Sequence, residues 1–224
     1  MLHELTVLPS PAEVSSAGAK FVAGRALATI EARGRFVVAA SGGRTPWLMY
    51  GDLASADLPW EKIVIYQVDE RITGIDDPDR NLSHLRSALG KTGAEIVGMP
   101  VEGENLDAAA DKYASLLPER FDLIHLGLGP DGHTASLVPG DPVLGETRPL
   151  VWTTTNDYQG YRRMTLTYPA LARADELLWL VTGADKVSAL TSLLAGDRMI
   201  PAGRVEGPLR STIFADVLAA PAAE

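Results

Sequence analysis

Two residues suited to proton transfer, Asp131 and His133, stand in the glycine-rich stretch GLGPDGHTASLVPG, residues 127–140. Imidazole titrates near neutral pH, and a nearby carboxylate can orient it or stabilise its charged form. The glycines also fit the G-x-G-x-x-G fingerprint of dinucleotide-binding loops, which needs a following helix and an acidic residue after the next strand. Because Pro139 leaves room only for a short helix over 134–138, we predict a site of chemistry rather than a cofactor loop.

A second glycine-containing loop, SGGRTP at residues 41–46, follows a predicted strand and opens a predicted helix. Its glycines let backbone N–H groups approach a ligand, and the helix N-terminus adds free donors and partial positive charge. An ordinary strand-to-helix turn, with Thr45 as N-cap and Pro46 at the first helical position, fits the same letters. The candidate phosphate-binding residues of this loop are Ser41, Gly42, Gly43 and Arg44.

Two further groups of charged residues lie where a ligand could meet them. The run Asp69-Glu70-Arg71 closes a predicted strand, where it could hold a polar substrate or form a solvated surface turn. Lys186 falls in the first turn of a predicted helix, where the helix dipole does not favour a cation. A bound anion would offset that cost, whereas a solvated surface lysine is the alternative interpretation.

The elements that must position these residues alternate between short apolar runs and helical patterns. Such runs are typical of strands covered on both faces, and strand-then-helix repetition indicates a parallel sheet with helices on both sides. Ligands of such sheets bind beyond the carboxyl ends of the strands, where all these loops lie. The predicted strands are 36–40, 63–68, 121–126, 150–153 and 177–181, and the predicted helices are 10–33, 45–54, 81–89, 105–117 and 184–194.

Composition limits the classes of protein that this chain can represent. Its 224 residues, 46% of them hydrophobic, suit a single domain over residues 1–224 with a sizeable core. A net charge of −9 argues against a nucleic-acid partner, and no apolar stretch is long enough to span a membrane. With no cysteine and four histidines a metal site is not expected, and we place His125 within a strand of the core. No signal peptide is evident, so a cytoplasmic location is the expectation.

Taken together, the motifs resemble those of the 6-phosphogluconolactonase family over almost the whole chain. The Asp-Gly-His-Thr-Ala-Ser block at 131–136 is the most specific part of the resemblance. The other matching segments are Ser41-Gly42-Gly43 with Thr45-Pro46, Asp69-Glu70-Arg71, Pro139-Gly140, Arg163-x-Thr165-Leu166-Thr167, Gly183-x-x-Lys186 and Ile200-Pro201-Ala202.

The resemblance implies a three-layer α/β/α fold with a mostly parallel Rossmann-like sheet, shared with sugar-phosphate isomerases and deaminases. It implies hydrolysis of 6-phospho-D-glucono-1,5-lactone in the oxidative pentose phosphate pathway, with no metal or organic cofactor. His133 would be the general base and Asp131 its partner, with the oxyanion held by glycine-loop N–H groups or Arg71. The implied substrate-binding residues are Ser41, Gly42, Gly43, Arg44, Asp69, Arg71, Asn81, Arg163 and Lys186.

Two positions depart from the family pattern. Arg80 stands where the family usually has serine, and it could contact phosphate or face solvent. Val138 stands where phenylalanine is common. Neither departure touches the Asp131–His133 block.

Two alternatives remain open at this point. Amino-sugar-phosphate deaminase/isomerases share the fold, but they carry a carboxylate five residues after the histidine, where this chain has Val138. The same loops could also form a non-catalytic sugar-phosphate-binding module. The sequence does not define the oligomeric state.

Overall fold

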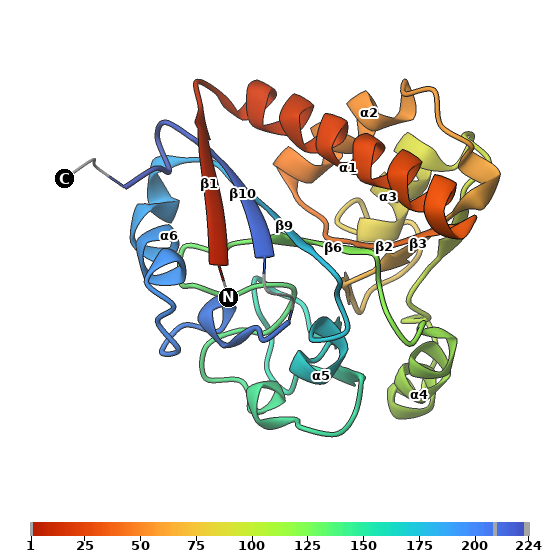
Figure 1. Ribbon diagram of the computed structural model, residues 1–224. Coiled ribbons are helices and arrows are strands. Elements are labelled where there is room, and N and C mark those ends of the chain that lie inside the picture. Colours follow the sequence, from red (N-terminus) through yellow and green to blue (C-terminus); the bar gives the residue numbers. More distant parts are fainter. Residues whose placement is uncertain (1, 208–209, 222–224) are drawn as a thin grey trace.

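The computed structural model describes residues 2–207 and 210–221, and its centre is a parallel β-sheet (Figure 1). The sheet has seven strands in the order β1-β10-β9-β6-β2-β3-β5, and all neighbouring strands pair in parallel. Its strands are β1 (Leu2–Leu8), β2 (Phe36–Ala40), β3 (Ile63–Gln67), β5 (Glu95–Val97), β6 (Leu123–Gly127), β9 (Leu177–Val181) and β10 (Arg210–Asp216).

A second, antiparallel sheet of three strands lies at the carboxyl edge of the first. Its strands, in the order β4-β8-β7, are β4 (Asp69–Arg71), β8 (Arg163–Leu166) and β7 (Val151–Thr153). Val68 joins the two sheets, because its N–H donates to Ala40 while its carbonyl accepts from the N–H of Leu166. The predicted strand at 150–153 therefore exists, but it belongs to this small sheet rather than to the parallel one.

Helices cover both faces of the parallel sheet and complete the predicted three layers (Figure 1). Helices α1 (Pro11–Arg33), α2 (Arg44–Ala54) and α3 (Asn81–Leu89) enclose one apolar core. Helices α4 (Leu106–Leu116), α5 (Tyr168–Leu171) and α6 (Val187–Leu194) enclose the other. The 3₁₀ helices are η1 (Trp60–Lys62), η2 (Pro142–Gly145), η3 (Ala184–Lys186) and η4 (Ala202–Arg204).

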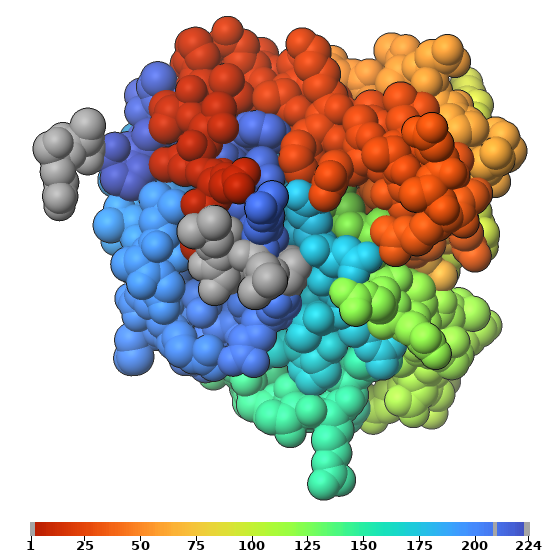
Figure 2. Space-filling model, in the orientation of Figure 1, coloured from red at the N-terminus to blue at the C-terminus, as the bar shows by residue number. Residues whose placement is uncertain are grey.

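Strands β1, β5 and β10 are not predicted from the sequence. β1 is an edge strand, and Leu5 and Val7 are exposed on it, so its apolar residues do not mark a buried face. In Figure 2 the red N-terminal residues lie on the surface of the molecule. β10 is interior to the sheet, but its first three residues, Arg210 to Thr212, are polar and it ends at Asp216, so its apolar run is short.

Some of the helix ends predicted from capping residues are confirmed and others are wrong. The predicted start of α1 is confirmed, since the Ser10 hydroxyl accepts from the N–H of Glu13 and Gly34 ends the helix in the left-handed region. Thr45 is not an N-cap, because α2 already begins at Arg44 after Gly43. The predicted helix at 184–194 is divided into η3 and α6.

The stretch 134–138 forms a tight turn rather than a helix. Thr134 and Leu137 make an isolated antiparallel bridge, and Ala135 between them adopts a positive φ of 49°. This result supports the view that the glycine-rich loop does not continue into a cofactor-binding helix. In the described part of the chain, no helix combines the length and apolar character needed to cross a lipid bilayer.

The topology fixes where a ligand can enter. From β2 the chain passes through α2 to β3, on one side of β2, whereas β6 pairs on its other side and continues to β9. The loops after β2 and β6 therefore separate at the carboxyl edge and leave a crevice between them, as expected at a topological switch point.

Candidate active site

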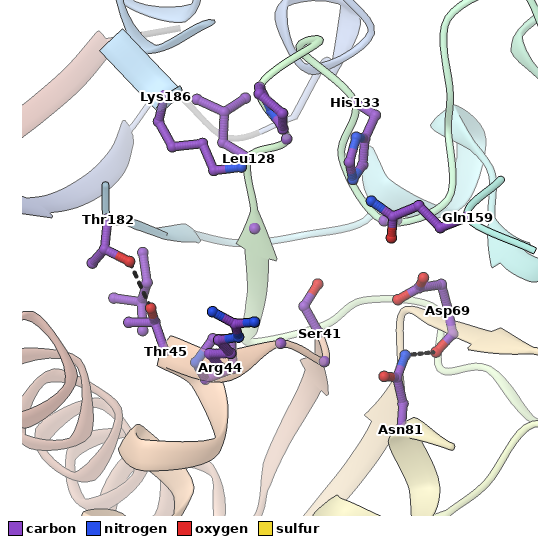
Figure 3. A pocket seen from close by; sticks show the side chains of 18 of the residues that line it. Ser41, Arg44, Thr45, Asp69, Asn81, Leu128, His133, Gln159, Thr182 and Lys186 are labelled. Carbon is purple, nitrogen blue, oxygen red and sulfur yellow. Dashed lines mark hydrogen bonds between the residues drawn. The ribbon is translucent and has the colours of Figure 1, made fainter. Parts of the chain in front are cut away.

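The crevice is a cavity of about 510 Å³ at the carboxyl ends of β2, β6 and β9 (Figure 3). The small sheet closes it on the side of β4 and β8. Every site residue predicted from the sequence lines this cavity except Asp131, which contacts it through His133. The predicted site residues that line it are Ser41, Gly42, Gly43, Arg44, Asp69, Arg71, Asn81, His133, Arg163 and Lys186.

Asp131 and His133 are in direct contact. The Nδ1 atom of His133 lies 2.6 Å from Oδ1 of Asp131, which also accepts from the His133 backbone N–H at 3.1 Å. Burial alone would raise the pKa of Asp131, but its hydrogen bonds with His133 and the positive charge of the protonated imidazole outweigh burial and lower it to about 2. An ionised carboxylate only accepts, so in the neutral imidazole Nδ1 carries the proton and Nε2 keeps the lone pair that a general base needs.

Two glycines of this loop are required by its backbone shape and close contacts. A Cβ atom at Gly129 would lie 2.0 Å from the Nδ1 of His133 and 2.7 Å from the Asp131 carboxylate. Gly132 has a φ of +79°, and a Cβ there would collide with Ile200. Gly127 has open space around its Cβ position. The dinucleotide-like pattern thus has a different origin here: Gly129 leaves room for the Asp131–His133 contact, and Gly132 provides a positive φ where a side chain would meet Ile200.

Tyr158 is a member of this site that sequence reasoning missed. Its hydroxyl lies 3.3 Å from the Nδ1 of His133, and the two rings meet edge to face at 4.9 Å between centroids. Burial, together with the charge of Asp131, raises the pKa of Tyr158, so its phenol stays protonated at neutral pH. Its residue type carries no motif, and only the hairpin between β7 and β8 brings it to the histidine.

A group of donors and cations lies on the opposite side of the cavity (Figure 3). The N-terminus of α2 faces it with no side-chain cap, so its first N–H groups have no partner within the helix. Arg44 lies in that first turn, and Lys186 approaches from η3 with its Nζ 3.1 Å from Asp185. The hydroxyls of Thr45 and Thr182, 2.7 Å apart, join α2 to the loop after β9.

A buried histidine holds the backbone of the loop at residues 41–46. His125 lies within β6, as predicted, and its Nδ1 accepts from the N–H of Ser41 at 3.3 Å. The hydroxyl of Tyr50 donates to the carbonyl of Ser41 at 2.6 Å. Burial lowers the pKa of His125 to about 3, so it is neutral and acts as an acceptor for the loop backbone.

The third side of the cavity comes from β4, β8 and the start of α3. Asp69 is buried and accepts from the hydroxyl of Ser136 at 2.6 Å. Arg71 donates to the side-chain oxygen of Asn81 at 2.9 Å, and the amide of Asn81 donates to the carbonyl of Asp69 at 3.1 Å. Burial lowers the pKa of Arg163, and the charge of Asp69 opposes that shift.

The alternative of a solvated turn at 69–71 is wrong, because Glu70 is fully buried. Its carboxylate accepts from the N–H groups of Arg71, Asn81 and Leu82, each within 2.9 Å. Glu70 therefore fixes the start of α3 against β4 and so positions Arg71 and Asn81 at the cavity.

Arg80 neither contacts the cavity nor faces solvent, contrary to both possibilities left by the sequence. It is fully buried, with Nε 3.3 Å from Glu70 and Nη2 2.8 Å from Glu102. It also donates to the carbonyl of Thr73 at 2.9 Å. Its charge neutralises Glu70, so this departure from the family pattern is structural. Within residues 2–207 and 210–221, no group of three or more potential metal ligands is assembled.

The chain is similar in sequence and in structure to known proteins. A family model described as glucosamine-6-phosphate isomerases/6-phosphogluconolactonase matches residues 9–214. A 6-phosphogluconolactonase of Synechocystis is 38% identical over 180 residues, covering 74% of each chain. One of Nostoc is 32% identical, covering 87% of this chain and 86% of its own. The crystal structure of a 6-phosphogluconolactonase from Thermotoga maritima superposes with a TM-score of 0.86 at 27% identity, over 96% of this chain and 99% of that one.

Proposed function

Because this chain belongs to the family of glucosamine-6-phosphate isomerases and 6-phosphogluconolactonases, we propose that its cavity hydrolyses a phosphorylated sugar lactone. The chain is an enzyme that converts 6-phospho-D-glucono-1,5-lactone to 6-phospho-D-gluconate, a step of the oxidative pentose phosphate pathway. One observation carries the choice of site: a histidine oriented by an ionised aspartate shares a cavity with an uncapped helix N-terminus and four cationic side chains.

In this mechanism the phosphate binds at the N-terminus of α2. The free N–H groups there, with Arg44 and Lys186, provide the donors and positive charge that a phosphate dianion needs. Tethering the substrate at this end brings the lactone to the side of the cavity occupied by His133.

Proton transfer then takes place at His133. Its Nε2 removes a proton from water while the water oxygen attacks C1 of the lactone, and Asp131 stabilises the resulting imidazolium. The tetrahedral intermediate collapses by cleavage of the bond between C1 and the ring oxygen. The imidazolium returns its proton to that oxygen, which becomes a hydroxyl, and His133 is ready for another cycle.

Glycine-loop N–H groups and Arg71 are the donors that the sequence suggests for the oxyanion. Three of them near His133 are not free: Gly129 donates to the His133 carbonyl, Gly132 donates to the Gly129 carbonyl, and His133 donates to Asp131. Arg71 keeps one guanidinium nitrogen on Asn81 and on the carbonyl of Asp79. The donor to the lactone carbonyl is therefore expected from another segment of the cavity.

The test of this function compares three substrates, with the spontaneous opening rate of each lactone subtracted. We expect kcat/KM for 6-phosphogluconolactone to exceed that for unphosphorylated gluconolactone by about 10²-fold, since charge-assisted contacts bind the phosphate. Glucosamine 6-phosphate should release no ammonia. Equal rates on both lactones, or ammonia release, would contradict the proposal. The predicted location of the reaction is the cytoplasm.

A further inference from the structure

The hairpin between β7 and β8 brings a residue with no assigned role to the cavity. Tyr158 and Tyr161 exchange backbone hydrogen bonds, so Gln159 and Gly160 form the two-residue turn between them. Both turn residues have positive φ, 52° and 84°. This is the backbone of a type I′ turn, whose first position usually holds Asn, Asp or Gly rather than Gln.

The turn is fixed to the active site on one side. The ring of Tyr158 packs edge to face on His133, and the Arg163 guanidinium lies 5.5 Å from the centroid of that ring. Arg163 also donates to the carbonyl of Tyr158 at 3.1 Å. These contacts hold the next residue, Gln159, at the edge of the cavity beside the histidine.

The side chain of Gln159 enters the cavity rather than leaving it. Gln159 is a lining residue, and Figure 3 shows its carboxamide between His133 and Asp69. It is thus on the side of His133, across the cavity from Lys186 and Thr45. Glutamine rarely adopts the left-handed backbone conformation in a turn. Because the side chain of Gln159 also points into the cavity, this conformation suggests a functional constraint.

We propose that Gln159 binds the lactone carbonyl through its side-chain amide and stabilises the oxyanion that forms when water attacks. The inference rests on the proposed function, because it assigns the missing donor to the same reaction. The three occupied N–H groups of the His133 loop leave this neutral donor beside the base. A donor aimed at the developing charge acts on turnover more than on substrate binding.

Two variants of Gln159 separate the amide from the turn. Gln159→Glu keeps the size and replaces the donor by a carboxylate, which repels an oxyanion. Gln159→Asn keeps the amide but shortens its reach, and asparagine is well suited to positive φ, so the hairpin should persist. Asp157→Asn, on the exposed part of the same hairpin and outside the cavity lining, is the matched control.

We expect kcat to fall about 10²-fold in both Gln159 variants, with KM changed less than about threefold and melting temperatures close to that of the wild type. The loss should be equal on phosphorylated and unphosphorylated lactone, because Gln159 is on the far side from the phosphate. Lys186→Ala, in contrast, should lose efficiency only on the phosphorylated lactone. The control should match the wild type.

If Gln159→Glu turns over at the wild-type rate, the amide is not the donor and the inference is wrong. A loss confined to the phosphorylated lactone would also overturn it, because it would move Gln159 to the phosphate. If the wild-type protein does not exceed the spontaneous rate, the proposed function fails, and this inference fails with it.

Discussion

At the scale of single residues, the account depends on how Asp131 holds His133. The two are close in sequence, and their contact needs only a local turn, so the sequence alone could predict both residues for the site. Tyr158 and Gln159 could not be identified in that way. Their residue types carry no motif, and only the pairing of β7 with β8 brings them to the histidine.

Replacing Asp131 by asparagine tests the orienting role. Asparagine can present its amide to Nδ1, so the proton can move to Nε2, where it blocks the base. We expect kcat of Asp131→Asn to fall about 10²- to 10⁴-fold, while the dissociation constant of 6-phosphogluconate changes little. Steady-state kinetics and calorimetry measure the two quantities. Turnover close to the wild-type value would show that the carboxylate does not orient the base.

The same substitution has a consequence for acid stability. The pKa of Asp131 is depressed in the folded protein from 3.8 to about 2, so its ionised form stabilises the fold fully above about pH 4. That contribution is lost as pH falls through about 2. The difference in unfolding free energy between wild type and Asp131→Asn should therefore shrink from pH 4 to pH 2 in urea titrations. A difference independent of pH over this interval would contradict the depressed pKa.

At the scale of elements, the loop after β6 depends on the absence of a side chain at Gly129. Gly129→Ala would place a methyl group against the imidazole and carboxylate, whose contact must then break. We expect kcat to fall about 10²-fold or more, because the base loses its orientation. Gly145→Ala in η2, where the added methyl meets open space, is the control. Near wild-type turnover in Gly129→Ala would mean that the Asp131–His133 contact is not required.

The start of α3 depends on a buried carboxylate, which gives a prediction of stability. Glu70→Ala removes the acceptor of three backbone N–H groups and leaves Arg80 with Glu102 as its remaining acidic partner. We expect a loss of about 3–5 kcal/mol of unfolding free energy in urea, as for removal of one partner of a buried ion pair.

A surface ion pair offers the comparison. Arg35 and Glu95 are both exposed and lie 3.7 Å apart, so Glu95→Ala should cost about 0–1 kcal/mol. If the two glutamate variants were equally stable, Glu70 would not hold β4 and α3 together.

The elements that the sequence predicted share a physical property. β2, β3 and β9 are buried along most or all of their length, so continuous apolar runs reveal them. β1 lies at an edge, and β10 begins with three polar residues and ends on another, so neither has such a run. The small antiparallel sheet was missed for another reason, because long-range pairing, not local pattern, determines that β4, β8 and β7 leave the main sheet.

At the scale of the whole molecule, we propose that the fold separates two chemical tasks, phosphate binding and proton transfer, across one cavity. The topological switch between β2 and β6 opens the crevice, the helix side supplies Arg44 and Lys186, and the loop after β6 supplies His133. A chain with a net charge of −9 thereby offers a local group of cations to an anionic substrate. We therefore expect mutations on the helix side to weaken substrate binding and mutations at His133 to slow turnover.

That separation is tested most directly by turnover and product binding in His133→Ala, measured together on the folded variant. We predict that hydrolysis of 6-phosphogluconolactone above the spontaneous rate falls about 10²- to 10⁴-fold at neutral pH. The dissociation constant of 6-phosphogluconate should stay within a few-fold of the wild-type value, because the phosphate contacts are intact. Hydrolysis at a near wild-type rate would contradict the account, since water would then be activated without this imidazole.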